Sequence, residues 1–121
     1  MKFIKTALLC LAMGSSYTFA DCAAPTVPAM PDGSKSSMDE MLAGKTAVST
    51  FQKDNATYLD CLSQDMEAAK NKLKASNKDE AAAAQADFTK LTEAYNSAVT
   101  AEETLANKFN AEIRAFKEVG Q

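Results

Sequence analysis

The sequence of 121 residues contains no histidine and no tryptophan, and it has only three cysteines, three prolines and four glycines. Without histidine, no imidazole is available as a general base, as a metal ligand or as an axial ligand of haem. The 13 basic residues are outnumbered by 16 acidic residues, so the chain has no electrostatic reason to bind a polyanion such as nucleic acid. We expect one small domain at most, with no nucleic-acid partner.

Residues 1–20 have the pattern of a cleaved export signal. Lys2 and Lys5 form a positively charged start, residues 7–13 are apolar, and residues 18–20 form a small-residue cleavage site. The apolar run is far shorter than the roughly 20 residues that span a bilayer. We therefore predict cleavage near Ala20 and a periplasmic or secreted bacterial protein whose mature chain has no integral membrane segment. The 11 basic and 16 acidic residues that remain give the mature chain a net charge of −5.

Two cysteines, Cys22 and Cys61, remain after removal of the signal, which takes Cys10 with it. An oxidising compartment favours a single intramolecular disulfide between them. The chain-entropy model gives a loop of this length a stabilisation of about 4 kcal/mol. Metal binding requires more ligands at shorter spacing, and redox-active cysteine pairs are usually two residues apart. We favour a structural disulfide over an intermolecular bridge, and we expect no metal and no other cofactor.

Residues 21–37 differ in composition from everything that follows them. Pro25, Pro28 and Pro31 recur at every third residue, which is the period of a polyproline II helix. Residues 31–33 (Pro-Asp-Gly) are typical of a turn. We therefore predict an extended proline arm over residues 21–37.

The arm is long enough to fold back along the helix that follows it. Cys61 lies 24 residues beyond Ser37, or about 36 Å along a helix, whereas the arm can extend over about 46 Å as polyproline II. We expect the arm to be attached at the middle of the first helix. Val27 and Met30 would then cover a flank of this helix near Phe51 and Tyr58.

Two amphipathic segments follow the arm. Ser37 with Glu40 forms a capping box for the first, and Asn77 is a suitable N-cap for the second. Apolar residues at helical spacing predict helices over about 38–75 and 78–119. The predicted stripe consists of Met41, Val48, Phe51, Tyr58, Leu59, Leu62, Met66, Ala69 and Leu73, followed by Ala84, Phe88, Leu91, Tyr95, Ala98, Leu105, Phe109, Ile113 and Phe116.

Two helices of similar length joined by a short polar turn predict an all-α fold, an antiparallel two-helix hairpin over residues 38–119 that resembles a coiled coil. The alternative is one unbroken helix of about 80 residues, because the turn contains neither glycine nor proline and some apolar residues stay in phase at 11-residue steps. We favour the hairpin, since a single amphipathic helix would leave its apolar stripe in water unless it oligomerised.

Four lysines, Lys70, Lys72, Lys74 and Lys78, form the densest group of charges. They are a candidate contact for an acidic partner or anionic lipid at the tip of the hairpin. Cations are also favourable at a helix C-terminus, where they face the negative end of the helix dipole. We favour this second interpretation.

Other polar residues have two interpretations each. Asn55 falls on the apolar stripe opposite Val99, where it would either set the register of the helices or turn to the solvent at the rim. Glu102 and Glu103 are adjacent carboxylates, but acid–base catalysis would need a buried pocket that separates their pKa values, and neighbouring residues on a helix do not face each other. We therefore expect no catalytic residues and no enzymatic activity.

The first half of the mature chain resembles a group of small exported bacterial proteins of unknown function. The resemblance consists of Cys22, the proline arm with its Pro-Asp-Gly turn, Met41, and residues 58–62 (Tyr-Leu-Asp-Cys-Leu). It covers about residues 22–62 and implies a shared scaffold, without any particular activity.

These observations favour a non-enzymatic interaction or structural module of the cell envelope, with a protein partner or a second copy of the chain. Leu42, Leu59, Val99 and Ala106 suggest a second, weaker apolar flank, which leaves a homodimeric four-helix bundle open. The alternative function is a periplasmic holdase that binds unfolded clients on apolar hairpin surface. A small-ligand carrier or an enzyme would require a pocket with convergent polar groups.

Overall fold

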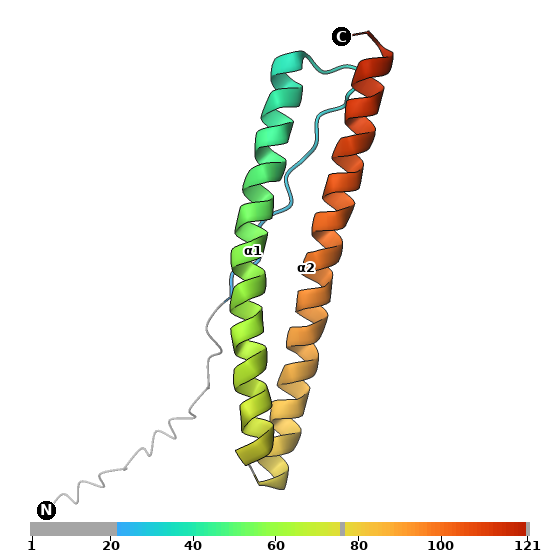
Figure 1. The fold of residues 1–121 in the computed structure, drawn as a ribbon. Coiled ribbons are helices and arrows are strands. Elements are labelled where there is room, and N and C mark those ends of the chain that lie inside the picture. Colours follow the sequence, from blue (N-terminus) through green and yellow to red (C-terminus); the bar gives the residue numbers. More distant parts are fainter. Residues whose placement is uncertain (1–21, 76, 121) are drawn as a thin grey trace, which may run out of the picture.

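The protein is represented by a computed structural model that describes residues 22–75 and 77–120. In this part of the chain, helices α1 (Met38–Ala75) and α2 (Lys78–Glu118) lie side by side and antiparallel, as Figure 1 shows. The predicted all-α hairpin is confirmed, and the alternative of one unbroken helix is wrong because the chain reverses between the two helices. The predicted export signal over residues 1–20 lies outside the described residues.

Local hydrogen bonds explain where the two helices begin. At α1, the Ser37 amide donates to Glu40 Oε2 at 2.6 Å and the Glu40 amide donates to Ser37 Oγ at 3.2 Å, which completes the predicted capping box. At α2, Asn77 Oδ1 accepts from the amides of Asp79 and Glu80 at 3.1 and 3.0 Å. Both caps satisfy amides that have no partner within the helix itself.

Helix α2 ends one residue before the predicted position. The Val119 amide donates to the Ala115 carbonyl, and the Gly120 amide donates to the Lys117 carbonyl. Gly120 has a φ of +75°, a left-handed conformation that glycine adopts without steric cost and that commonly ends helices.

The core is widest in the half of the hairpin near the helix ends at Met38 and Glu118. It contains six buried side chains, with Met30 of the arm, Ala101 and Ile113 packed against them. In the half near the turn, small residues such as Ala69 and Ala84 are buried at the seam, so the helices lie close together there. The six buried side chains of the wide half are Met41, Val48, Phe51, Leu105, Phe109 and Phe116.

Much of the predicted stripe is only half-buried. Two helices leave open grooves on both sides of their seam, so a side chain on the core face is enclosed only where a third element covers it. Periodicity therefore identified the correct face but overestimated the burial. The half-buried members are Tyr58, Leu59, Met66, Leu73, Phe88, Leu91, Tyr95 and Ile113.

Residues 22–37 provide a third element in the wide half. They run from the middle of α1 to the open end of the hairpin, the end at which α1 begins and α2 ends (Figure 1). On this path they lie over the groove between the two helices and not on α1 alone. Pro31 lies beside Gly44 of α1, and Met30 packs on the core cluster. Val27 remains 50% exposed, so its contribution to the core is smaller than we expected.

Candidate functional site

The arm is attached covalently at its start. Cys22 forms a disulfide with Cys61 of α1, with their Cα atoms 5.7 Å apart, and both residues are half-buried. The predicted intramolecular pairing is thus confirmed. The bond joins the beginning of the arm to the middle of α1, so this end of the arm is held against the hairpin.

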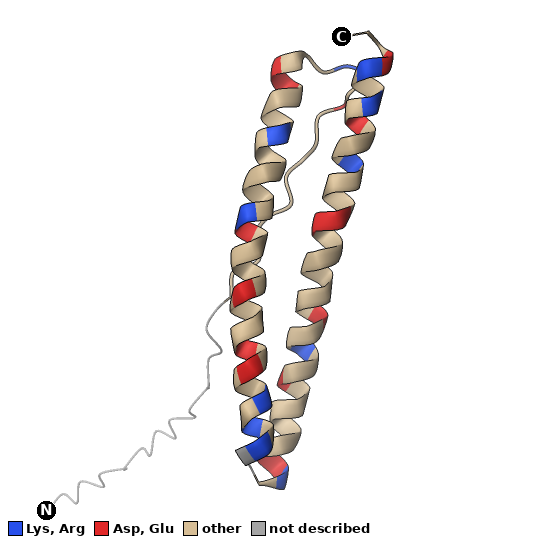
Figure 2. Ribbon diagram, viewed as in Figure 1, with Lys and Arg blue, Asp and Glu red and all other residues tan. Residues whose placement is uncertain are grey.

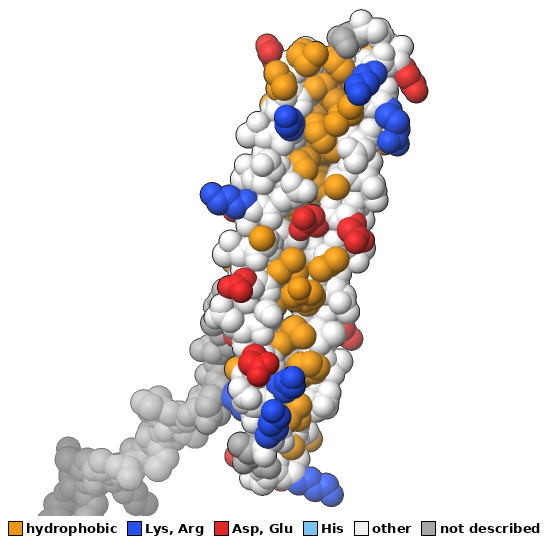
Figure 3. All heavy atoms as spheres, in the orientation of Figure 1, with side chains coloured by type: hydrophobic (Ala, Val, Ile, Leu, Met, Phe, Trp, Pro, Cys, Tyr) orange, Lys and Arg blue, Asp and Glu red, His pale blue; other side chains and the backbone are white. Residues whose placement is uncertain are grey.

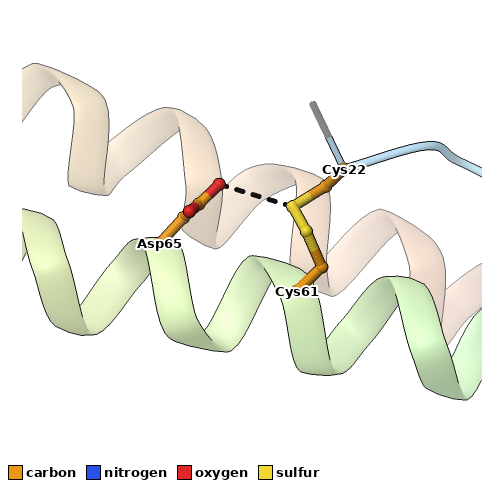
Figure 4. Close-up of side chains that lie close together, drawn as sticks. All are labelled: Cys22, Cys61 and Asp65. Carbon is orange, nitrogen blue, oxygen red and sulfur yellow. Dashed lines mark hydrogen bonds between the residues drawn. A yellow bond between two sulfur atoms is a disulfide. The ribbon is translucent and has the colours of Figure 1, made fainter. Parts of the chain in front are cut away.

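Asp65 lies directly beside the disulfide, as Figure 4 shows. Its Oδ2 atom is 3.3 Å from Cys22 Sγ, and its position four residues after Cys61 places both side chains on the same side of α1. A disulfide sulfur carries no proton, so this contact becomes a hydrogen bond only when Cys22 is a thiol. Sequence reasoning missed Asp65, although its spacing from Cys61 was a signal that could have been used.

The same three residues are the group that comes closest to a metal site in the described ranges 22–75 and 77–120. Their ligand atoms all lie within 4.8 Å of one another. Metals bind thiolates, however, and in this structure the two sulfur atoms are bonded to each other. The oxidised site therefore offers only the Asp65 carboxylate as a strong ligand.

A second attachment holds the other end of the arm against α2. The Gly33 amide donates to Glu112 Oε2 at 2.8 Å, and Gly33 is buried. A Cβ atom at this position would overlap the Glu112 carbonyl, so only glycine permits the approach. Gly44 has a similar role on α1, because its Cβ would lie 2.8 Å from the Pro31 ring. Sequence reasoning expected Gly33 only as a turn residue and missed Glu112.

The turn around Asp32 shapes the arm between these attachments and α1. The amides of Lys35 and Ser36 donate to its carbonyl, while the amide and hydroxyl of Ser34 donate to Oδ1 at 3.0 and 2.6 Å. Lys35 Nζ lies 3.3 Å from Oδ2. The Ser34 hydrogen bonds, with a smaller contribution from Lys35, lower the pKa of Asp32 below its ordinary value of 3.8.

Asn55 is the most buried large side chain of the hairpin, with 1% of its surface exposed. Its amide nitrogen donates to the Ala98 carbonyl at 3.1 Å and to Glu102 Oε2 at 2.8 Å. The side chain therefore points into the seam and not to the solvent. A shift of either helix along the other would leave the Asn55 amide without its partners, so these two hydrogen bonds define the register of the hairpin.

The adjacent glutamates Glu102 and Glu103 lie in different surroundings. Glu102 is half-buried and binds Asn55, whereas Glu103 is exposed. Two shallow clefts flank the arm, and both include Phe51 in a mainly apolar lining. Neither cleft brings together the two carboxylates that acid–base catalysis requires.

The four lysines are all exposed near the turn, where the ribbon in Figure 2 has basic and acidic positions close together. Lys72 and Lys74 lie in the last turn of α1, and Asp79 and Glu80 lie in the first turn of α2. This arrangement complements both helix dipoles. A role of the lysines in partner contact stays a prediction.

No protein-family model, no curated protein and no solved structure matches this chain. The resemblance of residues 22–62 to small exported bacterial proteins therefore stays a prediction. Within residues 22–75 and 77–120, neither helix has an apolar stretch long enough to cross a membrane.

Proposed function

We propose that this protein is a non-enzymatic interaction or structural module of the bacterial cell envelope, exported with a signal that is cleaved near Ala20. The observation that supports this proposal best is the asymmetry of the hairpin. One groove between the helices is covered by an arm with a covalent attachment at Cys22 and a polar one at Gly33. The opposite groove has no such cover from the described residues, and it offers a surface for a protein partner.

The uncovered groove can be assigned from the contacts of the arm. Residues of the arm share a cleft with Tyr58 of α1 and with Ala94 and Ala101 of α2. Successive residues on a helix differ by about 100° in direction, so Leu59 and Val99 project on the other side of the seam. Figure 3 views this side and shows apolar side chains along the groove with acidic side chains near its middle.

Charge indicates which kind of partner fits. Glu102, which the helical period places on the uncovered side, accepts a hydrogen bond from Asn55. Among the described residues, no lysine or arginine forms an ion pair with it. A partner helix with apolar residues around a central lysine or arginine would match this groove. Two copies of the same groove facing each other would bring like charges together, which makes a heterologous partner preferable to a homodimer.

Photo-crosslinking in intact cells tests the proposal. A photoreactive amino acid is placed at Val99, in the uncovered groove, or at Asn107, which is exposed on the outer face of α2, and the crosslinked products are identified by mass spectrometry. We expect one dominant partner from Val99, no corresponding product from Asn107, and weaker crosslinking when Glu102→Lys is added. The same products from both positions, or none from Val99, would contradict the proposal. Products that contain a second copy of the chain would instead assign the groove to self-association.

A holdase function is the second candidate, and the exposed apolar side chains favour it. Val27, Met38, Leu42 and Val119 each expose about half of their surface, between 47% and 54%. Such side chains can bind unfolded segments if they act together. Suppression of the aggregation of a heat-denatured client by the wild type, but not by a Met38→Ser, Leu42→Ser variant, would support it. The absence of suppression would favour the interaction module.

A further inference from the structure

The disulfide of the arm has a carboxylate as its neighbour. Asp65 Oδ2 lies 3.3 Å from Cys22 Sγ, and both cysteines are half-buried, so that they are partly accessible from solvent. Reactive cysteines are generally surrounded by positive charge, which stabilises the thiolate. Here the charged group in contact with Cys22 Sγ has the opposite sign (Figure 4).

Reduction of the bond proceeds by thiol–disulfide exchange. An incoming thiolate forms a new sulfur–sulfur bond with one cysteine, the bond between Cys22 and Cys61 breaks, and its electron pair leaves on the other cysteine as a thiolate. That thiolate then takes a proton from solvent. A second thiol of the reductant resolves the mixed disulfide, so the reductant is oxidised and both cysteines end as thiols.

Asp65 opposes this reaction by both routes. Attack on Cys22 Sγ brings an anionic thiolate towards the carboxylate, which repels it. Attack on Cys61 Sγ leaves the negative charge on Cys22, again beside the carboxylate, and a poorly stabilised leaving thiolate departs slowly. Either way, negative charge develops near a group that is already negative.

We propose that Asp65 protects the Cys22–Cys61 disulfide kinetically, by electrostatic repulsion of attacking and leaving thiolates. The arm then stays attached in a compartment that contains thiols and disulfide-exchange catalysts, and the cysteines do not shuffle into intermolecular bonds. The Cys22–Cys61 bond with its neighbour Asp65 is therefore a site that resists thiol–disulfide exchange. This conclusion does not depend on which partner the uncovered groove binds.

The test is the rate of reduction of the folded, oxidised protein at neutral pH by two thiols of different charge. Glutathione is anionic, whereas cysteamine carries an ammonium group. The variant is Asp65→Asn, which keeps the size of the side chain. Asp60→Asn is the matched control, because it removes the same charge from an exposed residue that is adjacent to Cys61 in the sequence. The Asp60 carboxylate accepts a hydrogen bond from Gln64.

We expect Asp65→Asn to accelerate reduction by glutathione about tenfold, and Asp60→Asn to change it less than about twofold. The acceleration should be smaller with cysteamine, and it should decrease in about 1 M salt, where the Debye length is about 3 Å. Asp65→Asn rates within about twofold of the wild type with both thiols would overturn the proposal.

A further variant separates electrostatic protection from simple loosening of the arm. Gly33→Ala disturbs the other attachment of the arm without changing any charge. If Gly33→Ala accelerates reduction as much as Asp65→Asn does, mobility of the arm explains the rates and the proposal is wrong. If Asp65→Asn is faster while its thermal unfolding with the disulfide intact matches that of the wild type, the proposal is supported.

Discussion

Replacement of Asn55 by alanine should destabilise the hairpin more than its size suggests. The substitution removes a 3.1 Å hydrogen bond to the Ala98 carbonyl and a 2.8 Å hydrogen bond to the Glu102 carboxylate. It also leaves a half-buried carboxylate without its donor. Removing one partner of a buried polar pair costs more than the pair contributes, because the group left behind loses both water and its partner.

The magnitude follows from the two bonds. A neutral hydrogen bond contributes about 1 kcal/mol, and one to a charged group contributes about 1.5–3 kcal/mol. We therefore expect Asn55→Ala to reduce the free energy of unfolding by about 3 kcal/mol, out of roughly 5–15 kcal/mol for a domain of this size. This corresponds to a decrease in Tm of about 12–24 °C.

Urea unfolding followed by circular dichroism measures the effect, and a double-mutant cycle with Glu102→Ala isolates the charged bond. The coupling energy should be about 1–2 kcal/mol. Asn71→Ala, at an exposed position of α1, is the control and should change stability by less than about 0.5 kcal/mol. An Asn55→Ala loss as small as that of the control, or strictly additive cycle values, would refute the assignment of Asn55 to the seam.

Three further predictions concern the arm. Removing the disulfide with Cys22→Ser and Cys61→Ser should lower the free energy of unfolding by about 4 kcal/mol in the chain-entropy model, measured by urea unfolding; a loss below about 1 kcal/mol would show that the crosslink constrains little. Gly33→Ala should displace the end of the arm and cost about 2–3 kcal/mol, since it breaks a hydrogen bond to a carboxylate; unchanged amide-exchange protection of residues 30–36 would contradict it. Because the native pKa of Asp32 lies below 3.8, its stabilising contribution is complete above that pH and is lost as the pH falls through the native value. A carboxyl titration by NMR with a midpoint at or above 3.8 would disprove this depression.

The helices were predictable because their signals are local. A capping box at Ser37, an N-cap at Asn77 and apolar residues at helical spacing define each helix by interactions within a few residues. The disulfide was also predictable, since loss of Cys10 with the predicted signal would leave two cysteines and only one intramolecular pairing. Burial was predicted less well. Tyr58 and Leu59 lie on the correct face but are only half-buried, because periodicity does not say whether a third element covers that face.

The candidate site was only partly predictable. Asn55 was recognised as a polar residue on an apolar stripe, but its two interpretations could be separated only by finding the acceptors Ala98 and Glu102 on the other helix. Asp65 and Glu112 were missed because their importance comes from the path of the arm. Glu112 has no local motif that marks it as the neighbour of Gly33, and for Asp65 the only local signal was its position four residues after Cys61.

The amino-acid order by itself determined where the two helices lie, because caps and apolar spacing act within a few residues. It favoured the reversal between them because a single amphipathic helix would leave its stripe in water, and it favoured the bond to Cys61 because loss of Cys10 with the predicted signal would leave one pairing. Only the tertiary structure decided that the arm lies across both helices, that Glu112 receives its far end and that Asp65 stands beside its sulfur. These outcomes depend on which of the two grooves the arm occupies. In the groove that it occupies, the arm packs closely at Gly33 and Gly44, where the absence of a side chain lets the backbone approach.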